Sequence, residues 1–196
     1  MSKMSKVCEE EAVREEASAF ETLLLTYAED RAIIIDDEIT PKMVRTVVIP
    51  LLRLDADEEE SPIDIYLNTP GGDAATTLII CDAIDSLKCP TTIHVLGCAY
   101  SGGLYIASAG RHNPNVKKVA YPSAEFMYHR LSTGFTGNMT ELEIEHKRAK
   151  YTQQKLEKYL LEHTAIDEKT LYKHKDADWF FDAKTALKLE IVNEVL

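Results

Sequence analysis

Two apolar segments of this chain each lead through a glycine-bearing turn into a helical pattern. Residues 62–67 alternate as a β-strand, enter the turn Thr69–Gly72 and are followed by a helical pattern over 73–87. The same order of strand, turn and helix recurs in residues 91–110. Hydrophobic periodicity distinguishes the two kinds of element. Because strands that are linked through helices pair in parallel, the repeat predicts an α/β fold with a parallel sheet and crossover helices.

The rest of the chain adds elements of the same two kinds. Further strands are expected at 32–35, 116–121 and 125–129. Helices are expected at 43–54, where Pro50 should cause a kink, and from 140 to about 163. A strand–helix–strand segment is expected at 178–195. The capping-box spacing of Thr140 and Glu143 predicts that the long helix begins there. Residues 1–19, rich in Glu and Ala, are expected to form a mobile arm of a single domain that spans all 196 residues.

Composition narrows the class of protein. The formal net charge of −11 argues against a nucleic-acid-binding protein, because phosphate contacts need clustered Lys and Arg. No apolar run approaches the ~20 residues that cross a bilayer, and the acidic N-terminus lacks the apolar segment of a signal peptide. The four cysteines have neither paired nor zinc-like spacing: Cys8, Cys81, Cys89 and Cys98. We therefore expect a reduced, cytoplasmic protein with no membrane segment and no metal.

The second glycine turn, Gly97–Gly103, carries a serine where strand gives way to helix. In a parallel sheet, turns at the carboxyl ends of neighbouring strands lie side by side, where ligands usually bind. The backbone N–H groups of Gly72 and Gly102 could then converge as an oxyanion hole, with Ser101 between them as a nucleophile. Taken alone, a serine in such a turn is more often a helix cap, and a Gly-Gly pair is more often only a tight turn.

A serine nucleophile needs a base, and histidine is the usual one. Among the six histidines, His129 ends the strand expected at 125–129, which brings it to an edge of the sheet where sites gather. Four others have structural explanations in a strand, a polar loop or a solvated helix face: His94, His112, His146 and His163. His129 is therefore the candidate base.

Three motifs in order make the chain resemble the ClpP family of serine peptidases. They are Asn68–Gly72, then Gly97-x-Ala99-x-Ser101 with the serine 29 positions after Gly72, then Met127–His129. The resemblance covers most of the chain, from about residue 28 to the C-terminal segment. It implies the ClpP/crotonase fold, which is a spiral of repeated βαβ units. It also implies that Ser101 is the nucleophile, His129 the general base, and Gly72 and Gly102 the oxyanion donors.

Further expectations follow from this resemblance. Family members hydrolyse peptides and unfolded proteins through a Ser-His acyl-enzyme mechanism inside a homo-oligomer of stacked heptameric rings. Residues 138–174 resemble the handle region, in which a long protruding helix joins the rings. An AAA+ unfoldase normally feeds the chamber and uses the ATP, so the peptidase itself is expected to bind no cofactor. Tyr66 matches one apolar tyrosine that docks this partner, whereas Asp64 stands where a second is usual.

The third member of the triad departs from the family pattern. An alignment without a gap places His174 where the orienting aspartate is expected. A neutral imidazole cannot stabilise an imidazolium as a carboxylate does. Asp176 is our choice for the third residue, and Asp178 is the alternative. A serine–histidine dyad without a third member is also open.

Two further departures lie close to the site, and His174 in place of the expected aspartate leaves other functions open. Gly102–Gly103 replaces a bulkier residue after the serine, and Arg130–Leu131 replaces the family's Gln-Pro. One alternative is a weakly active or inactive ring subunit that regulates a catalytic paralogue. Another is a phage-type maturation peptidase of the ClpP kind. CoA-thioester chemistry of the crotonase kind is disfavoured, because those enzymes need neither Ser101 nor His129.

Overall fold

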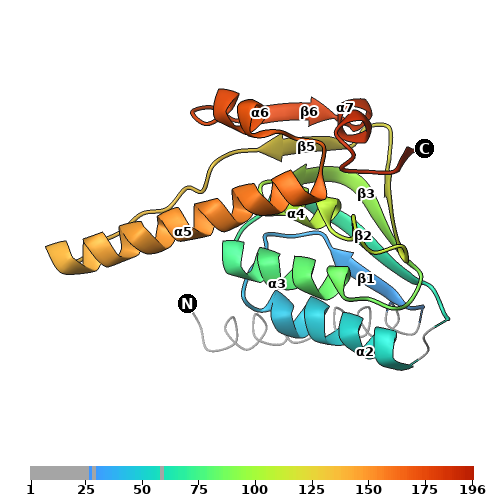
Figure 1. Ribbon diagram of the computed structural model, residues 1–196. Helices are drawn as coiled ribbons and strands as arrows, with labels where there is room; N and C mark the ends of the chain where they lie inside the picture. The colour runs from blue at the N-terminus through green and yellow to red at the C-terminus, as the bar shows by residue number, and fades with distance from the viewer. Residues whose placement is uncertain (1–26, 28–29, 58–59) are drawn as a thin grey trace, which may run out of the picture.

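The apolar alternation in the sequence is realised in one sheet (Figure 1). The computed structural model describes residue 27 and residues 30–57 and 60–196, so the arm expected at 1–19 lies outside the described residues. The described residues form seven strands in the order β1-β2-β3-β4-β7, with β5 pairing β3 and β6 pairing β5. The strands are β1 (Ala32–Ile35), β2 (Ile63–Thr69), β3 (Thr91–Tyr100), β4 (Val116–Ala120), β5 (Glu125–Tyr128), β6 (Trp179–Asp182) and β7 (Glu194–Val195).

Strand β2 shows why the sheet forms. Its side chains alternate between buried and half-buried positions, and Ile63, Ile65 and Leu67 are completely buried. The strand pairs in parallel with β1 on one side and with β3 on the other. Helix α3 (Ala74–Asp85) makes the crossover from β2 to β3. The predicted α/β class, with a parallel sheet and crossover helices, is confirmed.

Strand β3 is longer than its sequence pattern predicts. Its first half, Thr91–Val95, pairs with β4, and its last residues, from Cys98 to Tyr100, pair with β5. The change of partner occurs at Gly97, where a Cβ atom would lie 2.5 Å from Asn68 Oδ1. That oxygen accepts a hydrogen bond from the Cys98 N–H at 3.0 Å. The extension carries the strand directly to Ser101.

The helices pack around the sheet, and one of them projects away from it (Figure 1). Besides α3, they are the π-helix η1 (Val44–Val48), α2 (Ile49–Asp57), α4 (Gly102–Ser108), α5 (Met139–His163), α6 (Glu168–Lys173) and α7 (Ala183–Lys188). All seven residues of α4 are buried. The helix expected at 43–54 consists of η1 followed by α2, and the change from π-helix to α-helix falls at Ile49, one residue before Pro50.

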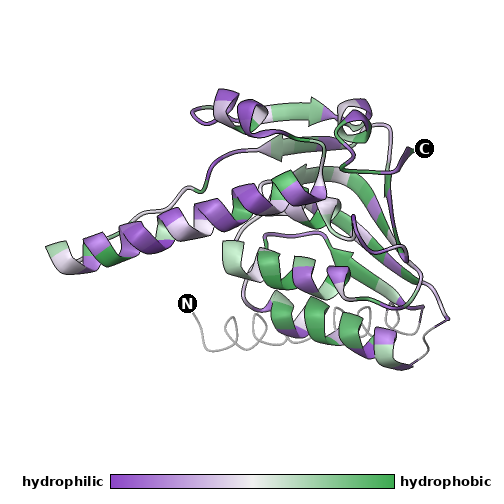
Figure 2. Cartoon of the chain, viewed as in Figure 1, coloured by the Kyte–Doolittle hydropathy of each residue, from purple (hydrophilic) through white to green (hydrophobic). Residues whose placement is uncertain are grey.

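Helix α5 projects from the body of the molecule, as Figure 1 shows. Its buried residues, Leu156, Tyr159 and Leu160, all lie near its C-terminal end, and its outer part is mainly hydrophilic (Figure 2). The predicted capping box at Thr140 is wrong. Asn138 caps the helix instead, because its side chain accepts from the Glu141 N–H at 3.1 Å while the Glu141 carboxylate accepts from the Asn138 N–H at 2.9 Å. The same spacing thus occurs two residues earlier and starts the helix there.

Among the described residues, the cysteines are free thiols, and no helix is long and apolar enough to span a bilayer. Cys81 and Cys89 are buried, and Cys98 is half-buried on β3. Burial raises the pKa of the Cys81 thiol well above its ordinary value. Cys81 therefore stays protonated and behaves as a small apolar side chain of the core. Cys8 lies outside the described residues.

Candidate active site

Ser101 sits in a strained turn between β3 and α4. Its backbone has φ +50° and ψ −114°, a conformation that a residue other than glycine seldom adopts. The turn is held on both sides, because the Ser101 N–H donates to the Met127 carbonyl at 2.9 Å and the Ser101 carbonyl accepts from the Leu104 N–H at 3.0 Å. The hydroxyl makes no capping hydrogen bond to α4 within the described residues. The helix-cap interpretation of this serine is therefore excluded.

The hydroxyl of Ser101 instead contacts His129. Ser101 Oγ and His129 Nε2 are 2.7 Å apart. The two residues meet because β5 pairs with the end of β3. Ser101 directly follows the last residue of β3, and His129 directly follows the last residue of β5. When the imidazole is neutral with its proton on Nδ1, Nε2 accepts the hydroxyl proton. This is the distance and direction that a serine and its general base require.

The first glycine turn lies directly against the Ser101 turn. A Cβ atom at Gly71 (φ +97°) would be 2.7 Å from Ser101 Cβ and 2.8 Å from the Gly102 nitrogen. The turn is anchored to Ile39, whose N–H donates to the Gly71 carbonyl at 2.7 Å and whose carbonyl accepts from the Asp73 N–H at 2.8 Å. The two turns are therefore side by side, as the parallel-sheet argument expects.

The amides of Gly72 and Gly102 have no acceptor among the described residues. A backbone N–H group without an acceptor is available to a ligand, because buried donors otherwise find partners. Gly72 borders the same hollow as Ser101, and Gly102 follows the serine directly. The arrangement can present two N–H donors to an oxygen atom that is bonded to the carbon under attack by Ser101.

A hollow of about 330 Å³ opens over these groups. It is lined by Glu38, Pro70, Gly71, Gly72, Ser101, His129, Leu131 and Ser132. A second hollow of about 330 Å³ shares Gly72, Leu131 and Ser132 with the first and continues to α5, where Phe135, Arg148 and Thr152 border it. The volume is in the range of small-ligand sites, and the two hollows together form a groove that passes Ser101.

Within the described residues, His129 makes no side-chain hydrogen bond besides the one to Ser101. The side chain of Asp176 is 84% exposed, and its ion-pair partner is Lys175 at 3.9 Å. His174 stacks on Trp179, with ring centroids 4.4 Å apart and planes at 10°. Burial and the neighbouring Lys173 lower the pKa of His174. Within the part of the chain that the structure describes, neither Asp176 nor His174 forms a hydrogen bond, ion pair or ring contact with His129.

Asp178 has a different relation to His129. Strands β5 and β6 are antiparallel, and their last pair is Tyr128 opposite Trp179. The ladder ends there, and His129 follows Tyr128 as Asp178 precedes Trp179. Of the two aspartates considered from the sequence, Asp178 is therefore the one that directly adjoins the β5–β6 ladder.

Sequence reasoning missed the side chains that hold these strands together. The hydroxyl of Tyr100, directly before Ser101, donates to the Glu125 carboxylate on β5. That hydrogen bond, together with burial, raises the pKa of Tyr100 to about 12, so the phenol stays a donor. The Tyr100 ring also meets Phe180 of β6 edge-on, at 5.6 Å between centroids. The aromatic and acidic residues at alternating strand positions were a usable signal, but pairing them required the register.

Comparisons with known proteins agree with this geometry. The Clp protease family model matches residues 15–196. An ATP-dependent Clp protease proteolytic subunit of Deinococcus radiodurans is 30% identical over 167 residues, which cover 85% of this chain and 80% of that protein. A protein of the same description from Streptococcus mutans is 30% identical over 169 residues, which cover 85% of each chain.

The match to the family covers nearly the whole sequence, and it includes both glycine turns and the strand that directly precedes His129. The resemblance stated from three short motifs is therefore confirmed along the chain. The chain belongs to the Clp protease family and is a peptidase of the ClpP type.

Proposed function

We propose that the chain hydrolyses peptide bonds through an acyl-enzyme, with Ser101 as the nucleophile and His129 as the general base. The observation that carries the proposal is the 2.7 Å contact between Ser101 Oγ and His129 Nε2. The strained turn that presents the serine at the groove supports it. Strained backbone is retained where the surrounding structure holds it and function needs it.

The chemistry proceeds in two halves. Ser101 Oγ bonds to the peptide carbonyl carbon while His129 Nε2 takes the hydroxyl proton, and the amides of Gly72 and Gly102 bind the oxyanion. The C–N bond then breaks, and the imidazolium gives its proton to the departing amine. In the second half, water attacks the ester, again losing its proton to His129, and the acid product leaves with Ser101 restored.

Asp178 is the third residue of the proposed triad, in place of our sequence-based choice, Asp176. The β5–β6 register supports Asp178, and the exposure of Asp176 together with its pairing to Lys175 weighs against it. A carboxylate beside His129 would hold the imidazole in the tautomer that accepts from serine and would stabilise the imidazolium.

Covalent labelling tests the nucleophile. A fluorophosphonate probe should label the wild-type protein and fail to label Ser101→Ala. Ser132→Ala is the matched control, because this second serine lines the same hollow and should leave labelling unchanged. Equal labelling of wild type and Ser101→Ala would refute the assignment.

Two isosteric variants test the third residue. Asp178→Asn should lower kcat for a fluorogenic peptide by about 10²–10⁴-fold, because the amide favours the wrong imidazole tautomer. Asp176→Asn should stay within twofold of wild type. The reverse order would restore Asp176, and full activity in both variants would identify a Ser101–His129 dyad.

We further propose that the chain works as a homo-oligomer of stacked heptameric rings, with residues 138–174 as the handle. Helix α5 supports this, because large apolar side chains lie exposed along its projecting part, with Met139, Ile144 and Tyr151 between 51% and 74% exposed. Both curated relatives are described as ATP-dependent, which supports an AAA+ unfoldase partner and a cytoplasmic location. Sedimentation velocity at micromolar concentration tests the assembly, and a monomer would contradict it.

A second candidate is a ring subunit with little activity of its own. One observation favours it: no carboxylate within the described residues hydrogen-bonds to His129. Peptide turnover by the purified protein at a rate that is lost in Ser101→Ala would eliminate this candidate. Labelling without turnover would support it.

A further inference from the structure

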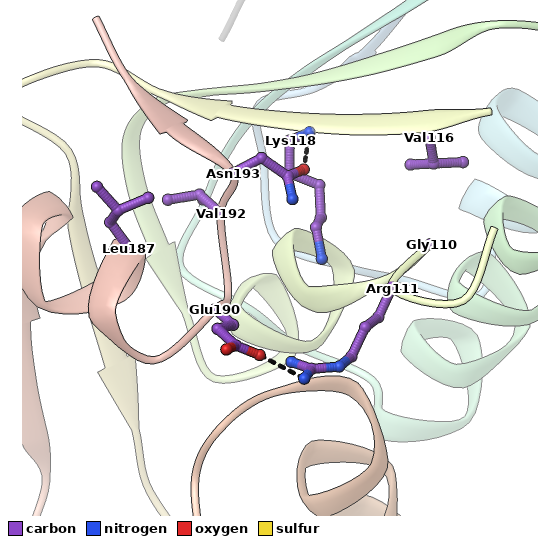
Figure 3. A pocket seen from close by; sticks show the side chains of 8 residues that line it. All are labelled: Gly110, Arg111, Val116, Lys118, Leu187, Glu190, Val192 and Asn193. Atoms are coloured by element: carbon purple, nitrogen blue, oxygen red, sulfur yellow. Dashed lines mark hydrogen bonds and ion pairs between the residues drawn. The ribbon is translucent and has the colours of Figure 1, made fainter. Parts of the chain in front are cut away.

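A hollow lies away from Ser101, at another part of the described structure (Figure 3). Its volume is about 420 Å³, and it is bordered by β4, by the residues after α4 and by the segment after α7. It sits at the opposite end of α4 from the serine, and the intervening seven-residue helix is about 10 Å long. The hollow is therefore separate from the peptidase groove.

Lys118 lies on its wall and is almost completely buried. The residue is 1% exposed, on the same strand face as Val116. Its ammonium group has three donors, and within the described residues it makes one long hydrogen bond, 3.4 Å to the Ser108 carbonyl. Lysine is almost never fully buried unless it is paired. The group is therefore short of acceptors.

Arg111 borders the hollow beside Lys118 (Figure 3). Its Nη2 pairs with the Glu190 carboxylate, whereas its Nη1 is buried with no hydrogen-bond partner among the described residues. A buried donor without an acceptor costs about 1–3 kcal/mol, and more when it is charged. Burial, and after it the charge of Arg111, lower the pKa of Lys118 to about 8, while the carboxylates of Asp85 and Glu190 act in the opposite direction.

We propose that this pocket binds a small organic anion whose phosphate or carboxylate group lies between Lys118 Nζ and Arg111 Nη1. Glu190 pairs with Nη2 of Arg111, so within the described residues Nη1 still lacks an acceptor. An anionic oxygen would also supply the acceptors that both groups lack. Val116, Leu187 and Val192 form apolar parts of the wall, and the volume accommodates a ring or a short aliphatic chain beyond the charged group. This site goes beyond the proposed peptidase function and does not depend on it.

Calorimetry with defined probes tests the site. Phenyl phosphate, benzoate and inorganic phosphate are titrated into the assembled protein in chloride at constant ionic strength. At least one organic anion should bind with a submillimolar Kd, and Lys118→Met should weaken it by tenfold or more. Lys117→Met is the matched control, because Lys117 precedes it on β4, carries the same charge and is exposed with Glu194 as its partner. This control should stay within twofold of wild type.

Arg111→Gln provides a second variant that does not alter the buried lysine, and it too should weaken binding by tenfold or more. Tighter binding of phenyl phosphate than benzoate assigns the charged group as phosphate, and the reverse order assigns a carboxylate. No binding of any probe up to 10 mM would overturn the proposal, and so would equal affinity in Lys118→Met and Lys117→Met. Inorganic phosphate binding as tightly as phenyl phosphate would refute the apolar part of the site.

Discussion

Helix α4 has polar groups of different kinds at its two ends. Near its N-terminal end, the amides of Gly72 and Gly102 have no acceptor within the described residues, and the Ser101 hydroxyl meets His129. Near its C-terminal end, the groups that lack acceptors belong to long cationic side chains: Lys118 has one long hydrogen bond, and Arg111 Nη1 has none within the described residues. The helix between them is entirely buried. One packed element therefore separates a site shaped for attack on a carbonyl from a pocket shaped for an anion.

The C-terminal end also contains a polar cluster that is fully paired. Asp85 accepts from the Gly110 N–H at 2.6 Å and from the Tyr159 hydroxyl at 2.9 Å, and it meets His163 Nε2 at 3.3 Å. Tyr159 stacks on His163, with centroids 3.7 Å apart. His163, expected on a solvated helix face, is instead packed, because α5 turns this face toward α3. The paired cluster stabilises the fold, whereas the unpaired groups beside it and at Ser101 are available to ligands.

The largest effect is expected at the N-terminal end. His129→Ala should lower kcat for a fluorogenic peptide by about 10³-fold or more, because the serine loses its base. His94→Ala is the comparison, since His94 lies on β3 with Asp64 as its partner at 2.8 Å. It should change kcat by less than threefold. Equal loss in both variants would show that histidine substitution acts through stability rather than through the serine.

Gly71→Ala should destabilise the folded protein at the same end. The new Cβ would lie 2.7 Å from both Ser101 Cβ and the Tyr100 carbonyl oxygen, at a φ of +97°. Strain and overpacking together predict a loss of about 2–4 kcal/mol in the free energy of unfolding. Urea titration measures it, with Gly134→Ala as the control, because a Cβ at Gly134 meets nothing within 4 Å. A loss under 1 kcal/mol would mean that the two turns separate easily.

Near the C-terminal end of α4, Lys118 should make the free energy of unfolding depend on pH in the alkaline range. Burial and Arg111 lower its pKa from 10.5 to about 8 in the folded protein. Between these values the unfolded chain binds more protons, so stability rises with pH. Between pH 7 and pH 10, the free energy of unfolding of the wild type should rise by roughly 2–3 kcal/mol relative to that of Lys118→Met. Urea titrations of both proteins across this range measure the difference, and a flat difference would show that Lys118 is solvated.

Asp85→Asn should have the smallest effect, a loss of about 1–2 kcal/mol in the free energy of unfolding at pH 7. Burial opposes ionisation, but the hydrogen bonds from His163, Gly110 and Tyr159 prevail and lower the pKa of Asp85. A lowered carboxyl pKa stabilises the folded protein above about pH 4, and this contribution is lost as the pH falls further. The difference between wild type and variant should therefore shrink in acid. A constant difference down to pH 3 would assign the effect to packing.

Local patterns were sufficient for most of the secondary structure. The alternation at 62–67 and the helical pattern at 73–87 became β2 and α3 with shifts of a few residues. Apolar period and glycine turns are short-range properties, so one strand or helix contains the whole signal. The start of α5 was misplaced because two overlapping segments have capping-box spacing, and only the entering backbone decides between them.

The pairing of distant segments could not be predicted from local sequence patterns. Tyr128, directly before His129, pairs with Trp179, directly after Asp178, only through the β5–β6 register, which joins residues about fifty positions apart. Residue type and spacing favoured Asp176, which the fold leaves exposed. The burial of Lys118 also could not be predicted from the sequence, because two consecutive lysines give no sign that one is buried and the other solvated.

By itself, the sequence determined the α/β class, the family, and the serine, histidine and glycines that the proposed peptidase uses, because each depends on a short motif or a local period. The tertiary structure alone decided whether Ser101 caps a helix or meets a histidine, and which of two adjacent lysines is buried beside a hollow. Those outcomes depend on contacts between segments far apart in the chain. Strand register and burial set such contacts only when the whole core is assembled.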